Sequence, residues 1–177
     1  MSELPRPDAV SSPRVYIDAW ENSRKEFLAL CDARPAAFQE RPGDGSWSPS
    51  EIAEHLQLTQ FFYARSIPIC LSGKLGYDMN ATDSVNHERI FGRVARAQGI
   101  QNPERVTPEK NWDLETARKK LDQAEASMRK NLEGAEIEAL RGRGYDHPLH
   151  GPASLLDWLW LLTLHEAAHL QAMAAKS

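Results

Sequence analysis

The sequence has few cysteines, no long apolar run and no excess of positive charge, and each absence excludes a class of protein. Cys31 and Cys70 have no CxxC spacing and no secretory context, so we interpret them as buried, reduced thiols. The net charge of −4 disfavours nucleic acid as the main partner, because phosphate binding requires a basic surface. No apolar run approaches the ~20 residues that cross a bilayer, and the first residues lack the apolar stretch of a signal peptide. We therefore expect a cytoplasmic protein that binds neither nucleic acid nor membrane.

What the sequence does contain is helical periodicity, interrupted by loops rich in glycine and proline. Residues 1–12 are polar and contain proline, which predicts a flexible N-terminal arm, and residues 13–177 have the length of a single domain. Apolar residues recur at helical spacing in four stretches: 13–33, 48 to about 68, 113–132, and about 153 to near the end. We predict an all-α fold, a four-helix bundle with a long connection between helices 2 and 3.

The boundaries of these helices differ in clarity. Ser48, Pro49 and Glu51 form an S-x-x-E capping box with proline at the first helical position, so the second helix has a definite start. Pro68 is expected to kink or end this helix. Residues 77–110 give no clear assignment, although 84–97 can form a helix, and residues 133–152 are predicted to be a loop. The long connection can return the chain to the other end of the bundle, so helices 2 and 3 need not be antiparallel.

Three histidines are the candidate ligands of one metal ion. His165 and His169 lie four residues apart and therefore on one face of the last helix. His55 shares a helical stripe with Ile52, Leu56 and Phe62, so it is expected to face the core. Three neutral imidazoles from two facing helices leave an open fourth position, as in catalytic zinc sites. The remaining histidines are not expected to be ligands, since His147 and His150 fall in the predicted loop and His87 is predicted at the surface.

The His165–His169 motif has two other interpretations. H-E-x-x-H is also the zinc-protease motif, in which the glutamate is the general base. Such enzymes commonly take their third ligand from further along the chain, and only eight residues follow His169, so the peptidase interpretation is disfavoured. Core histidines bonded to backbone carbonyls are the structural alternative.

Three sequence blocks resemble the DinB-like (YfiT-like) proteins. Residues 47–56 resemble the W-S-x-x-E-x-x-x-H-L motif of that family, 147–155 resemble its H-P-x-x-G-x-x-S-L segment, and 165–169 match its closing histidine pair. The resemblance implies a four-helix bundle, a homodimer and a three-histidine site, usually with zinc or nickel, formed here by His55, His165 and His169. Relatives often have glutamine three residues after the last histidine, whereas this chain has Gln171 two residues after it, which leaves Gln171 without support as a site residue.

The resemblance predicts fold and metal more strongly than reaction. Family members of known activity include S-transferases and isomerases that use bacillithiol, mycothiol or glutathione. Our first hypothesis is an enzyme that activates a low-molecular-weight thiol for transfer to a small electrophile, with Glu166 as a candidate base and Glu51 as either a cap or a partner of His55. The alternatives are a metal-dependent hydrolase using metal-bound water and a non-enzymatic bundle that binds metal or ligand.

Overall fold

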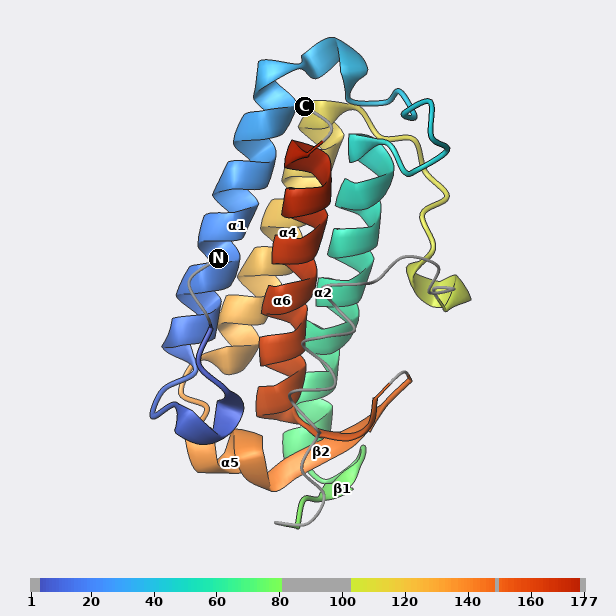
Figure 1. The fold of residues 1–177 in the computed structure, drawn as a ribbon. Helices are drawn as coiled ribbons and strands as arrows, with labels where there is room; N and C mark the ends of the chain where they lie inside the picture. Colours follow the sequence, from blue (N-terminus) through green and yellow to red (C-terminus); the bar gives the residue numbers. More distant parts are fainter. Residues whose placement is uncertain (1–3, 81–102, 149, 176–177) are drawn as a thin grey trace.

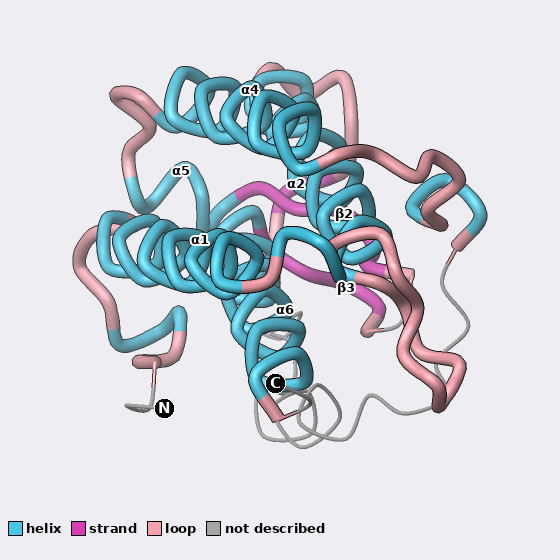
Figure 2. The backbone as a smooth tube through the Cα atoms, turned by 90° about the horizontal axis from the view of Figure 1, so that it is seen from above, coloured by secondary structure: helices cyan, strands magenta, loops and turns pink. Residues whose placement is uncertain are grey.

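The computed structural model describes residues 4–80, 103–148 and 150–175. Four long helices form a bundle, as the sequence predicts (Figure 1). They are α1 (Arg14–Ala33), α2 (Pro49–Leu71), α4 (Leu114–Leu132) and α6 (Leu155–Ala174). α1 packs mainly on α6 and α2 mainly on α4, which the view along the bundle shows as two adjacent pairs (Figure 2).

The order of the helices in space depends on the long connection between α2 and α4. Both helices begin at the end of the bundle where α1 finishes, and both run toward the end where α6 starts (Figure 1). α2 and α4 are therefore parallel neighbours. The 3-10 helix η3 (Glu104–Val106) lies in the connection between them and packs against α2. The possible helix over 84–97 lies outside the described residues.

The predicted loop over 133–152 is instead largely ordered secondary structure. It contains the short helix α5 (Ile137–Gly142) and the strands β2 (Arg143–His147) and β3 (Gly151–Ser154), and β2 also pairs with β1 (Tyr77–Asp78). All pairings are antiparallel. Glycine makes the sheet possible, because a Cβ at Gly144 would lie 2.3 Å from a backbone oxygen of β3. The prediction was wrong here because glycine and proline also occur where strands approach closely.

Pro68 neither ends α2 nor leaves its backbone unsatisfied. The helix continues to Leu71 with the proline inside it. Proline has no N–H to donate to the carbonyl four residues earlier, which here belongs to Ala64. The side-chain amide of Asn131 on α4 donates to that carbonyl at 2.9 Å. A donor from the neighbouring helix thus replaces the missing intrahelical bond.

The N-terminal segment contacts the base of the bundle. Residues 1–12 were expected to be a flexible arm, and from residue 4 onward the segment includes the 3-10 helix η1 (Pro7–Ala9). Pro7 and Val10 are buried. Their carbonyls accept hydrogen bonds from the guanidinium of Arg141 on α5. Among the described residues, we find no helix with the length and apolar character needed to cross a bilayer.

Candidate metal centre

The three predicted histidine ligands converge inside the bundle. His55 comes from α2, and His165 and His169 come from successive turns of α6. The Nε2 atom of His165 lies 2.9 Å from Nε2 of His55 and 3.1 Å from Nε2 of His169. One ligand atom from each of the three residues lies within 4.8 Å of the others, a spacing that can hold a metal ion. The structure therefore brings these residues together as the sequence predicts, and their role as ligands stays a prediction.

Local sequence places both helices that carry the histidines. α2 begins with a capping box, in which Glu51 N donates to Ser48 Oγ and Ser48 N donates to the Glu51 carboxylate at 2.9 Å. α6 begins with a second capping box, formed by Ser154 and Asp157. This second box was not predicted from the sequence. Each box fixes where its helix starts.

The backbone around η3 orients the His55 ring. Nδ1 of His55 lies 2.6 Å from the carbonyl oxygen of Val106. A carbonyl can only accept, so Nδ1 carries the proton and Nε2 presents a lone pair toward the other two imidazoles. The residue before His55 holds the same segment against α2, because the carboxylate of Glu54 accepts from the backbone N–H of Lys110 at 2.6 Å. Val106 is therefore the orienting partner that a metal-bound imidazole requires.

All three imidazoles are held neutral. Burial lowers the pKa of His55, and burial together with the neighbouring imidazoles lowers the pKa of His165 well below its ordinary value. Burial and the proximity of His55 lower the pKa of His169 to about 3. A neutral imidazole has one ring proton. If Nε2 of His165 carries that proton, this single hydrogen faces both Nε2 of His55 and Nε2 of His169. The chemistry of this donor set fits a cation, because neutral imidazole is a common metal ligand.

Trp47 covers one side of the three imidazoles. Its ring lies 4.9 Å from the ring of His55 and is stacked 6.3 Å from the ring of His169, measured between centroids. The residue immediately precedes the cap of α2. The sequence motif contains Trp47, but no role at the site was predicted for it.

Glu166 lies between the two histidines in sequence and has different partners. It is fully buried, and its carboxylate accepts hydrogen bonds from Trp20 and Gln60. Arg24 Nε donates to it at 2.7 Å, and Arg24 also donates to Gln60 at 2.6 Å. Burial raises the pKa of Glu166, although Arg24 opposes that shift. The carboxylate therefore joins α6 to α1 and α2.

Comparison with known proteins decides the family. The model of the DinB superfamily matches residues 19–173. The chain belongs to the DinB superfamily. Members of this superfamily often bind metal, which agrees with the converging histidines. No curated protein matches the sequence.

A solved structure supports the fold of this DinB-superfamily chain. The crystal structure of TT2238, a four-helix bundle protein, superposes with a TM-score of 0.59 over 92% of this chain and 98% of that chain. The two sequences are 24% identical, so the likeness concerns the fold alone.

The remaining sequence candidates lie away from the three imidazoles or have other partners. Glu51 serves as a cap and forms a bidentate ion pair with Arg41. His147, predicted in a loop, belongs to β2 and packs against Trp158 and His150 with centroids 4.3 and 4.5 Å away. Gln171 is exposed on α6. His87 lies outside the described residues.

Proposed function

We propose that this chain holds one divalent metal ion, zinc or nickel, with His55, His165 and His169, and uses it to activate a low-molecular-weight thiol for S-transfer to a small electrophile. The observation that carries the proposal is the convergence of three neutral Nε2 atoms from two helices. When bound, the ion supplies a Lewis acid that lowers the pKa of a coordinated thiol or water. Three protein ligands leave room for that exchangeable group.

The protein's own residues would orient the ligands. Val106 fixes the tautomer of His55, so that Nε2 always faces the site. Trp47 packs against His55 and His169 and restricts their rings. Glu166 remains a candidate base, but its hydrogen bonds to Trp20, Arg24 and Gln60 favour a positioning role.

The position of Glu166 favours thiol chemistry over hydrolysis. In the hydrolase hypothesis the nucleophile is metal-bound water, whose pKa such an ion lowers to about 7, and Glu166 is the base that the sequence suggested for this step. A coordinating thiol is deprotonated outright by such an ion, so it does not require a protein base. With Glu166 engaged by Arg24, the thiol reaction is the one that these residues support better.

The proposal is tested by metal analysis and two assays on protein purified without a histidine tag. We expect about one zinc or nickel ion per chain, and turnover of monochlorobimane with bacillithiol, mycothiol or glutathione. Cleavage of p-nitrophenyl acetate without thiol would instead support the hydrolase. Stoichiometric metal with neither activity would support a non-enzymatic bundle.

Two variants separate the site from the rest of the molecule. His55→Ala should remove the metal and the thiol-dependent turnover, because it deletes the α2 ligand. His150→Ala, which changes a histidine outside the three-imidazole cluster, should retain both. Equal metal content in the two variants would reject the metal site. The homodimer and the cytoplasmic location implied above stay predictions, and light scattering would test the dimer.

A further inference from the structure

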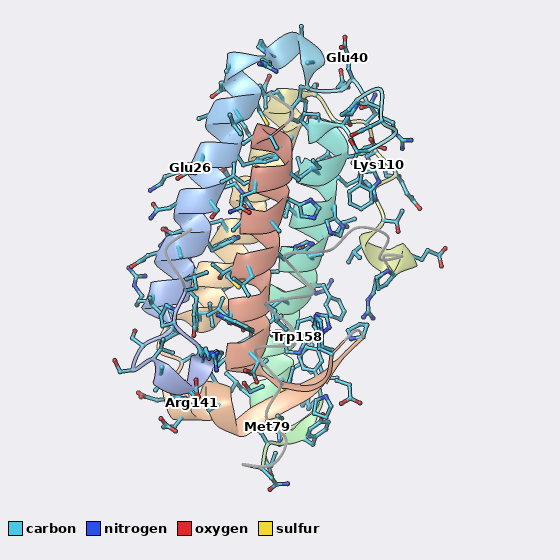
Figure 3. The ribbon with its side chains drawn as sticks, in the orientation of Figure 1. Glu26, Glu40, Met79, Lys110, Arg141 and Trp158 are labelled. Atoms are coloured by element: carbon cyan, nitrogen blue, oxygen red, sulfur yellow. The ribbon has the colours of Figure 1, made fainter. Side chains whose placement is uncertain are left out.

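A cavity of about 410 Å³ lies next to the metal centre, at the end of the bundle where α1 and α6 finish and α2 starts. Glu40, one of its lining residues, marks this end of the molecule in Figure 3. The volume is within the range of small-molecule binding sites, which is roughly 300–1,000 Å³. The cavity is therefore large enough for a substrate-sized molecule.

Two residues belong to both the cavity and the metal centre. His169 and Trp47 line the cavity, and the two rings stack on each other. The Nε2 atom of His169 also lies 3.1 Å from the Nε2 atom of His165. A molecule in the cavity would therefore lie beside His169, one of the proposed metal ligands.

The wall of the cavity is mainly apolar. The apolar side chains come from α1, α2 and α6 and include Leu30, Ile52, Ala172 and Met173. Cys31 also lines it, and burial raises the pKa of this thiol to about 12, so the thiol is neutral near pH 7. A neutral, buried thiol is a weak nucleophile, so Cys31 contributes to the cavity as an apolar surface.

Charged groups of both signs line the rim of the cavity, and one of them is an arginine that can pair with an anion. Two arginines and one glutamate line the cavity: Arg34, Arg41 and Glu40. Arg41 is already paired with Glu51. Among the described residues, no side-chain partner is found for the exposed guanidinium of Arg34. Arg34 is thus the lining cation that can pair with a ligand, while Glu40 at the same rim opposes an anion.

We propose that this cavity binds a small apolar molecule bearing a carboxylate, with the apolar part against Trp47 and Ile52 and the carboxylate at Arg34. The inference deepens the proposed function, because it names the chemical class of the electrophile. Guanidinium pairs well with carboxylate, and the apolar wall stabilises the rest of the molecule by burial.

Calorimetry with 4-phenylbutyrate and the uncharged 4-phenyl-1-butanol tests the inference on the full chain, both metal-free and loaded with zinc. The acid should bind more tightly than the alcohol. Arg34→Gln should weaken binding of the acid by about fivefold, the upper range for an exposed ion pair, and leave the alcohol within about twofold. Glu40→Gln should strengthen binding of the acid, and Arg65→Gln, which changes an arginine outside the cavity lining, should change neither.

Ala172→Trp is designed to fill the cavity and should abolish binding of both compounds, while circular dichroism and thermal unfolding report whether the variant folds. Equal affinity for acid and alcohol, or an Arg34→Gln variant that behaves like wild type, would overturn the carboxylate assignment. Absence of binding by wild type, or binding unchanged in folded Ala172→Trp, would overturn the cavity as a site. Arg34-dependent binding to protein that never takes up metal would support the cavity and reject the proposed function.

Discussion

Two faces of α6 carry buried polar groups that are satisfied in different ways. On one face, Glu166 has an opposite charge, Arg24, and two further donors, Gln60 and Trp20. On the other face, Nε2 of His165 lies close to Nε2 of both His55 and His169, and at most one hydrogen is available for these two contacts. The Glu166 carboxylate has its partners within the protein, whereas the three histidines direct lone pairs at one point. This difference separates a group that stabilises the fold from a group that can bind a ligand.

The largest expected effect comes from removing the Glu166 carboxylate. Glu166→Ala should lower the free energy of unfolding by about 3–5 kcal/mol, because it leaves the Arg24 guanidinium buried without its counter-charge. Urea unfolding of metal-free protein measures the change. The double variant Arg24→Met, Glu166→Leu should lose much less stability, because it removes both charges. A loss below about 1 kcal/mol in Glu166→Ala would show that the pair does not have this role.

The next largest effect is expected from replacing one of the three histidines. His165→Gln should weaken zinc binding by more than about 100-fold. Changing a residue that only hydrogen-bonds to a metal ligand typically lowers affinity about 10- to 100-fold, and losing the ligand itself should cost more. The free energy of unfolding of the metal-free protein should change little, because the variant removes one of the three Nε2 atoms that lie close together without a bound ion. Competition with a chelator measures affinity, and His150→Gln is the matched control. Unchanged affinity in His165→Gln would place the metal elsewhere.

A smaller effect is expected from pH. In metal-free protein, the pKa of His169 lies near 3 when folded, against an ordinary value of 6.5. As pH falls below 6.5, the unfolded chain therefore binds more protons, and stability is lost by up to about 1.4 kcal/mol per pH unit for each such imidazole.

The matched comparison for this pH effect is His169→Gln, which should have a shallower dependence between pH 7 and 5. The raised pKa of Glu166 acts with the opposite sign, since it favours the folded state at lower pH, but both proteins contain it. Urea unfolding in the presence of a chelator measures the two slopes. Identical slopes would contradict the lowered pKa of His169 in the folded protein.

The sequence predicted the convergence of the three histidines better than their surroundings. His165 and His169 are brought together by helical spacing alone, and the helix boundaries 13–33 and 113–132 lie within one residue of α1 and α4. The partners of these residues were not predictable in the same way. Val106, which orients His55, is 51 residues away and follows a segment with no clear pattern. Arg24 is 142 residues from Glu166 and resembles any other charged residue on an amphipathic helix.

By itself, the sequence determined the four helices, the cap of α2 and the histidines that share a helical face. These features depend on the helical period and on hydrogen bonds between residues a few positions apart, so a short window contains their cause. The tertiary structure decided the parallel course of α2 and α4, the small sheet, the engagement of Glu166 by Arg24 and the cavity beside His169. Those features depend on which distant surfaces pack together, and periodicity within one helix contains no information about its partner.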